Sequence, residues 1–71
     1  MKKIKRNDTV IIDNMKFFAV DTYKVNGFRL VILSDNYHYY VVQEKGIEIT
    51  ILFSGEYLTC IKFVDGVKRM A

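Results

Sequence analysis

The stretch TYKVNGFRLVILSDNYHYYVV (residues 22–42) decides the fold, because runs of β-branched and aromatic residues alternate there with two turn signals. Asn26-Gly27 is the strongest hairpin signal in the chain, since both central residues of a type I′ turn need positive φ. Asp35-Asn36 is a weaker signal of the same kind. The stretch therefore predicts three consecutive antiparallel strands, joined by tight turns at these two dipeptides.

Turn signals on either side extend this pattern over most of the chain. Asp13-Asn14 precedes the stretch, and Glu44-Lys45-Gly46 and Ser54-Gly55-Glu56 follow it. The runs between the turns carry strand-type residues, and no helix of useful length fits them. The sequence predicts an all-β fold, a six-stranded antiparallel up-and-down meander that forms a coiled sheet or small barrel. The expected strands cover residues 9–12, 15–25, 28–34, 37–43, 47–53 and 57–64.

With these loop lengths, one face of the sheet collects most of the large apolar residues and only Asp21 and Thr59 interrupt it seriously. An inward-pointing Asp21 needs a partner such as the hydroxyl of Tyr39 or Thr59, whereas a bulge in the long second strand rotates it outward. The length of that strand favours the bulge. The expected core face comprises Val10, Ile12, Phe17, Ala19, Tyr23, Val25, Phe28, Leu30, Ile32, Tyr37, Tyr39, Val41, Ile47, Ile49, Ile51, Phe53, Tyr57, Ile61 and Phe63.

Length and composition predict one small folded domain over residues 1–71, with a basic N-terminal arm (1–7) and a short basic tail (65–71). The single cysteine, Cys60, excludes an internal disulfide and fits a reducing compartment. The N-terminal sequence lacks the apolar run of a signal peptide, and no segment approaches the ~20 apolar residues of a membrane helix. We therefore expect a cytoplasmic protein that does not associate with membranes.

The opposite face of the predicted sheet is unusually apolar for a surface exposed to water. The register divides the tyrosine-rich segment, so that Tyr37 and Tyr39 point to the core and His38 and Tyr40 point outward. A contiguous exposed apolar patch usually marks an interface. The alternative is that the sheet curls further, or that the terminal segments fold over the patch, and that it forms a second small core. We interpret it as a surface for a protein partner or a second copy of the chain. This outer belt comprises Phe18, Val20, Val31, Leu33, His38, Tyr40, Leu52 and Leu58.

The basic residues indicate an alternative function, because the meander brings both termini and two of the turns to one end of the sheet. Such a basic end attracts phosphates in a salt-dependent way. Lysines near sheet edges also discourage aggregation, so the charge pattern has a structural explanation as well. The residues expected to contact a nucleic acid are Lys3, Lys5, Arg6, Lys24, Arg29, Lys45 and Arg69.

Residue types for catalysis or cofactor binding are sparse. The four glycines are isolated at turns and form no phosphate-binding loop. One histidine and one cysteine do not complete a transition-metal site without carboxylates. His38 and Cys60 are expected two strands apart on one face, so only strong coiling of the sheet would pair them as base and nucleophile. The sequence therefore predicts a non-enzymatic protein with no cofactor and no bound metal.

The segment VIIDNMKFFAVDTYKVNGFRLVILSD combines a hydrophobic strand, a turn, an aromatic-bearing strand and an asparagine–glycine hairpin. Over about residues 8–34 this order resembles short, uncharacterised β-rich proteins of Gram-positive bacteria and their phages. The resemblance assigns no site residue. It implies a small accessory or inhibitor-type protein, of the kind found in phages or mobile elements, rather than an enzyme.

Overall fold

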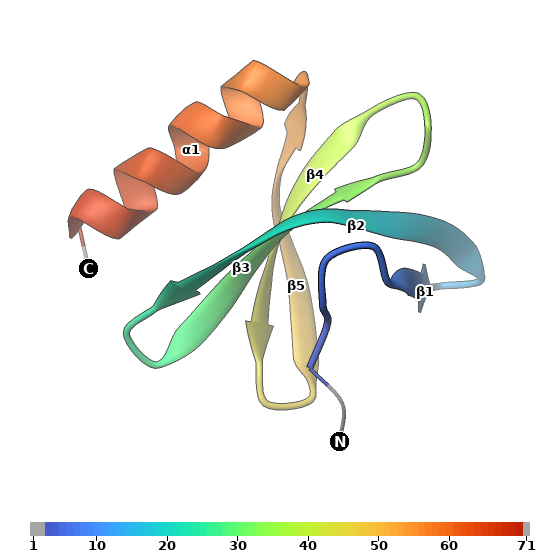
Figure 1. Cartoon of the computed structure of the whole chain (residues 1–71), viewed down its shortest axis with the longest axis horizontal. Coiled ribbons are helices and arrows are strands. Elements are labelled where there is room, and N and C mark those ends of the chain that lie inside the picture. The colour runs from blue at the N-terminus through green and yellow to red at the C-terminus, as the bar shows by residue number, and fades with distance from the viewer. Residues whose placement is uncertain (1–2, 71) are drawn as a thin grey trace.

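The structure, a computed structural model that describes residues 3–70, contains a five-stranded antiparallel sheet followed by one helix (Figure 1). The strands pair in chain order, so the sheet is a meander curled into a half-barrel with β1 and β5 at its edges. Within the described residues β1 and β5 do not pair with each other. The elements are β1 (Thr9–Ile12), β2 (Met15–Val25), β3 (Phe28–Ser34), β4 (Tyr39–Lys45), β5 (Glu48–Gly55) and α1 (Tyr57–Met70).

The antiparallel meander predicted from the turns is confirmed for its first five strands. The bounds of β1, β2 and β3 are those expected, while β4 and β5 lie one or two residues later than expected. Asn26-Gly27 does join β2 to β3, but only Gly27 takes a positive φ, of 82°, so the predicted type I′ geometry was wrong there. Both residues of Asp13-Asn14 have positive φ, at 50° and 66°, as that turn type requires.

The prediction of a sixth strand over residues 57–64, and of an all-β fold without a helix, was wrong. These residues begin α1, and the predicted basic tail (65–71) forms its last turns as far as residue 70, while residue 71 lies outside the described residues. The β-branched and aromatic residues of this segment suggested a strand, yet the spacing of its apolar residues fits one face of a helix. The side chains of this face pack against the sheet: Tyr57, Cys60, Ile61, Val64 and Val67.

A β-bulge in β2 determines which residues share a face of the sheet. Ala19 pairs with Leu33 and Asp21 pairs with Ile32, which leaves Val20 as the extra residue. Side chains alternate between the two faces of a strand, so one extra residue shifts this alternation by one position. Side chains before and after the bulge that would otherwise share a face therefore point to opposite faces of the sheet. The expected single core face was therefore wrong. The bulge itself was anticipated, but the outward rotation of Asp21 expected from it was wrong, because Asp21 lies on the face that α1 covers. Asp21 stays half-buried on the helix side, where its Oδ2 accepts a hydrogen bond from the Tyr57 hydroxyl at 2.8 Å.

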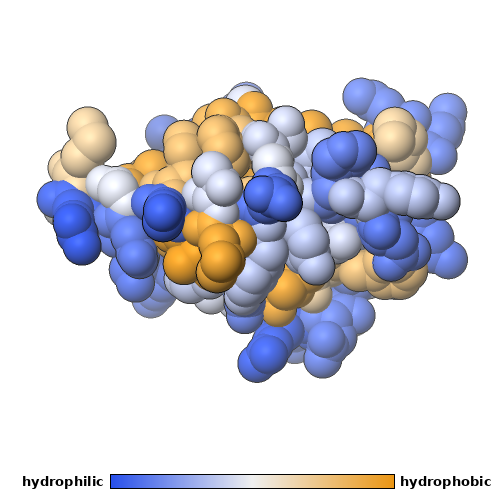
Figure 2. All heavy atoms as spheres, turned by 90° about the horizontal axis from the view of Figure 1, so that it is seen from above, coloured by the Kyte–Doolittle hydropathy of each residue, from blue (hydrophilic) through white to orange (hydrophobic). Residues whose placement is uncertain are grey.

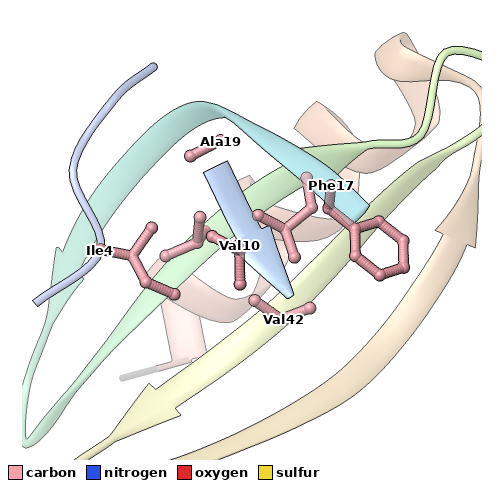
Figure 3. Close-up of a cluster of buried hydrophobic side chains, with 7 residues drawn as sticks. Ile4, Val10, Phe17, Ala19 and Val42 are labelled. Carbon is pink, nitrogen blue, oxygen red and sulfur yellow. The ribbon is translucent and has the colours of Figure 1, made fainter. Parts of the chain in front are cut away.

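The sheet has a hydrophobic core on each face, because α1 covers one face while β1 and the N-terminal segment cover the other (Figure 1). Figure 3 shows Val10 of β1 lying over Val42 of the sheet, with Ile4 beside it. We call the first core the helix-side core; its buried residues are Val25, Leu30, Ile32, Val41, Cys60 and Val64. We call the second the arm-side core; its buried residues are Ile4, Val10, Phe17, Ala19, Val31, Leu33 and Val42.

A buried ion pair holds the N-terminal segment onto the sheet. Arg29 of β3 lies opposite Glu44 of β4, and its Nη1 donates to Glu44 Oε1. The backbone N–H of Ile4 donates to Glu44 Oε2 at 3.0 Å, and Arg29 Nη2 donates to the Ile4 carbonyl at 2.6 Å. The two charged side chains are only 18% and 8% exposed. Part of the predicted arm (1–7) is therefore packed against the sheet, while residues 1–2 lie outside the described residues.

Replacing Glu44 by alanine is expected to lower the free energy of unfolding by about 3 kcal/mol, because it leaves the Arg29 guanidinium buried without its counter-charge. This loss approaches the whole stability of a domain of this size, which is about 3–5 kcal/mol. Urea unfolding followed by far-UV circular dichroism measures the effect. Glu48→Ala is the matched control, since Glu48 is exposed at the start of β5. Equal stabilities of the two variants would show that the buried ion pair does not secure the fold.

Candidate functional site

The outer belt predicted from the sequence does not lie on one exposed surface. Val31 and Leu33 are fully buried in the arm-side core, because the bulge in β2 lets β1 and the N-terminal segment fold over them. Tyr40 packs at the edge of that core, with its ring 5.3 Å from that of Phe17 in an edge-to-face arrangement. These three residues belong to a second core, which is the alternative that the apolar pattern left open.

The remaining residues of the outer belt come from different elements. Phe18 of β2, Leu52 of β5 and Leu58 of α1 are exposed, and His38 is exposed in the turn between β3 and β4. Val20, the bulged residue, packs against the helix-side core. Leu58 does not join the other residues of the outer belt on the sheet, because it lies on α1 rather than on a sixth strand.

Asp35 organises the turn that contains His38. Its Oδ1 accepts the backbone N–H groups of His38 at 2.8 Å and Tyr37 at 2.9 Å, and its Oδ2 accepts the Tyr40 hydroxyl at 2.9 Å. The N–H groups of His38 and Tyr37 lower the pKa of Asp35, because they stabilise its ionised form. The same carboxylate raises the pKa of the Tyr40 hydroxyl that it binds. The tyrosine-rich segment is therefore a hydrogen-bonded turn followed by a strand.

Strand β5 presents the most concentrated exposed apolar sequence. Ile49 and Ile51 of this strand are 38% and 48% exposed, Leu52 is exposed beside them, and Ile47, in the turn just before the strand, is 73% exposed. Ile49 and Ile51 lie on the face of the arm-side core, opposite Glu44 and Val42 of β4, but they are exposed and do not belong to that core. Apolar residues reach the surface in patches between polar ones in the view from above (Figure 2). The sequence assigned the three isoleucines to the core, since their alternation is equally typical of a buried face.

A pocket of about 480 Å³ opens at the end of the half-barrel where the β2–β3 and β4–β5 turns lie. Of the residues expected to contact a nucleic acid, Lys3, Lys24, Arg29 and Lys45 line it. Lys5 and Arg69 are exposed but do not line this pocket, and Arg6 Nε lies 3.9 Å from Asp21 Oδ1. The fold thus brings four of the seven predicted basic residues together around one cavity.

Cys60 and His38 lie in different environments and do not form a pair of base and nucleophile, which would have required strong coiling of the predicted sheet. Cys60 is fully buried in the helix-side core, and this burial raises the pKa of its thiol. A thiol in such a position is a poor nucleophile, because the thiolate is the reactive form. Among residues 3–70, no cluster of histidine, cysteine or carboxylate side chains is arranged to hold a metal ion. No helix in this range is long and apolar enough to span a membrane.

Comparisons of the chain with protein-family models, with curated proteins and with solved structures find no match. The resemblance of residues 8–34 to short proteins of Gram-positive bacteria and their phages therefore stays a prediction.

The hydrogen bonds to Asp35 make the stability of the fold depend on pH in the acidic range. A carboxyl group whose pKa is lower in the folded than in the unfolded chain stabilises the fold above its unfolded value, about 3.9, and loses this contribution as the pH falls through the folded value. Between about pH 5 and pH 2 the wild-type protein is therefore expected to lose more stability than the Asp35→Asn variant. Urea midpoints at the two pH values measure the difference.

Asp13→Asn serves as the control for this comparison. Asp13 also lies in a turn, and within residues 3–70 its side chain makes no hydrogen bond. It is expected to follow the wild type at both pH values. An Asp35→Asn variant that loses as much stability as the wild type on acidification would contradict the assignment.

Proposed function

We propose that this protein is a non-enzymatic interaction domain that associates through the open edge of β5, and that the strand it pairs with is β5 of a second copy. The observation that carries the proposal is the combination, in one strand, of an unpaired sheet edge with exposed isoleucine side chains. An edge of this kind is a template for another strand, which supplies main-chain hydrogen bonds while the side chains supply burial. The free thiol of Cys60 supports a reducing, cytoplasmic setting.

The chemistry of the β5 edge supports its use as an interface. In the described residues β5 pairs with β4 alone, so the backbone N–H and C=O groups on its other side have no strand partner. Soluble proteins commonly protect such an edge with lysine, proline or a very short strand. β5 has eight residues and contains no lysine, arginine or proline. Its exposed aliphatic side chains therefore favour a covering partner over a permanently open edge.

The alternative edge, β1, is less suited to pairing. It has only four residues, and a short edge strand offers few hydrogen bonds to an incoming chain. Its residue Val10 is also committed to the arm-side core. These features favour β5 as the edge that associates.

The sequence of β5 is compatible with itself in an antiparallel pairing centred on Ile49. In this register Ile49 faces Ile49 of the second copy, and Ile51 faces its Ile47. Glu48 faces Thr50, so a carboxylate meets a hydroxyl and no like charges stand opposite each other. The paired segment ends at Leu52, where a bulge interrupts the ladder between β4 and β5. Each isoleucine in this register thus faces another isoleucine.

Light scattering over a dilution series is expected to show a dimer that dissociates as the protein is diluted. Ile49→Lys places two ammonium groups opposite each other in the proposed register, and it is expected to raise the dimer dissociation constant at least about tenfold. Leu58→Lys is the control, since Leu58 is an exposed aliphatic residue on α1 and outside the proposed interface. Its dissociation constant should equal that of the wild type.

Two results would contradict the proposal. A wild-type protein that remains a monomer over the whole dilution series would exclude pairing with a second copy. A dimer that the Leu58→Lys substitution weakens as much as Ile49→Lys would place the interface elsewhere. Circular dichroism of each variant tests whether a change in mass arises from unfolding. Both variants are expected to remain folded, because both residues are exposed.

A further inference from the structure

The pocket between the β2–β3 and β4–β5 turns combines positive charge with an apolar wall. Lys3 approaches it from the N-terminal segment, Lys24 from β2 and Lys45 from β4. Within residues 3–70 none of these three lysines forms an ion pair. Three ammonium groups around one cavity raise the local concentration of anions, because charge of one sign lines a concave surface with low-dielectric walls.

The carboxylate in the pocket wall does not cancel this charge. Glu44 is held by Arg29, and its other oxygen accepts the backbone N–H of Ile4. The Glu44 side chain is buried, so it presents little surface to a ligand. An entering anion therefore meets the lysines, while the charge of Glu44 is balanced inside the wall.

The apolar lining limits the kind of anion that fits. Val25, Phe28 and Ile47 contribute to the pocket, and Phe28 is half-buried with its ring at the margin of the helix-side core. A bare inorganic anion would gain nothing from this apolar surface. A ligand that carries a planar or apolar group beside its negative charge uses both parts. The volume, about 480 Å³, lies in the range of about 300–1,000 Å³ that is typical of sites for small organic ligands.

We propose that this pocket binds a nucleotide unit, with its phosphate at Lys24 and Lys45 and its base against Phe28. Lysine ammonium groups bind phosphate as point charges, and an aromatic side chain provides a stacking surface for any base. The nucleotide can be free or part of a single strand, since both offer the same phosphate and an accessible base. A duplex lacks the accessible base, because its bases are stacked inside the helix. All the residues that line this site belong to one chain, so the site is complete without the pairing of β5.

Fluorescence anisotropy with labelled ten-nucleotide single strands, together with competition by mononucleotides, tests the proposal in low-salt buffer. Lys24→Ala combined with Lys45→Ala is expected to weaken binding at least tenfold. It should also make the slope of log affinity against log salt shallower by about 1.4, at roughly 0.7 for each phosphate contact to a single strand. Lys16→Ala combined with Lys62→Ala is the matched control, since it removes the same charge from exposed lysines outside the pocket.

Phe28→Leu separates stacking from charge. It keeps an apolar side chain in the wall and removes the ring, so it is expected to weaken binding severalfold without changing the salt slope. Urea unfolding of this variant establishes that it remains folded, because Phe28 also packs at the helix-side core. An unchanged affinity in a folded Phe28→Leu variant would overturn the placement of the base.

Competition identifies the class and source of the ligand. Displacement by a mononucleotide supports a site for one nucleotide unit, and displacement only by single strands supports a unit within a chain. Four further outcomes would overturn the proposal. Two concern the protein: no binding of any nucleotide or single strand at low salt, or equal loss of affinity in the two double-lysine variants. Two concern the ligand: a duplex that binds as tightly as the single strand, or polyglutamate that competes as well as the single strand.

Discussion

The buried pair of Arg29 and Glu44 is the interaction on which the rest of the structure depends. It joins β3 to β4 and also binds both the N–H and the carbonyl of Ile4. The N-terminal segment is thereby fixed over one face of the sheet, where Ile4 closes the arm-side core (Figure 3). The same pair forms part of the wall of the basic pocket. One charged contact thus contributes to the packing of the core and places a balanced ion pair in the wall of the candidate ligand site.

The bulge at Val20 explains how so short a chain covers both faces of its sheet. A flat meander of this length would leave one face exposed, and its apolar residues would be in contact with water. Because the bulge reverses the alternation of β2, Phe17 and Ala19 face the arm-side core while Tyr23 and Val25 face the helix-side core. β1 then folds over the sheet from one end, and α1 covers the opposite face (Figure 1). Two small cores take the place of one large one.

Local sequence signals predicted the elements well where the turns decide the structure, and poorly where tertiary packing decides it. Asn26-Gly27 and Asp13-Asn14 located three strands to the residue, since Gly27, Asp13 and Asn14 take a positive φ that few residue types tolerate. Residues 57–64 include residue types that favour strands, yet they form a helix, because in the helix Cys60 and Val64 pack against the sheet. The basic end was predicted from the charges together with the meander topology. Its pocket was not, because it depends on how Lys3 is placed by a contact between residues distant in sequence.

Ile47 connects the two candidate sites. It lines the basic pocket, and it precedes the edge strand where the proposed pairing places it opposite Ile51 of a second copy. In these two proposals the nucleotide and the second chain both contact the side chain of Ile47. Binding at the two sites is then linked, and linkage is reciprocal: a nucleotide changes the dimer dissociation constant by the factor by which dimerisation changes nucleotide affinity. The sign of this coupling follows from whether the second copy encloses the pocket or occupies part of it. Because Ile47 is 73% exposed in the single chain and lines the pocket, pairing at β5 would cover surface that a nucleotide also contacts, and the coupling would act through this side chain.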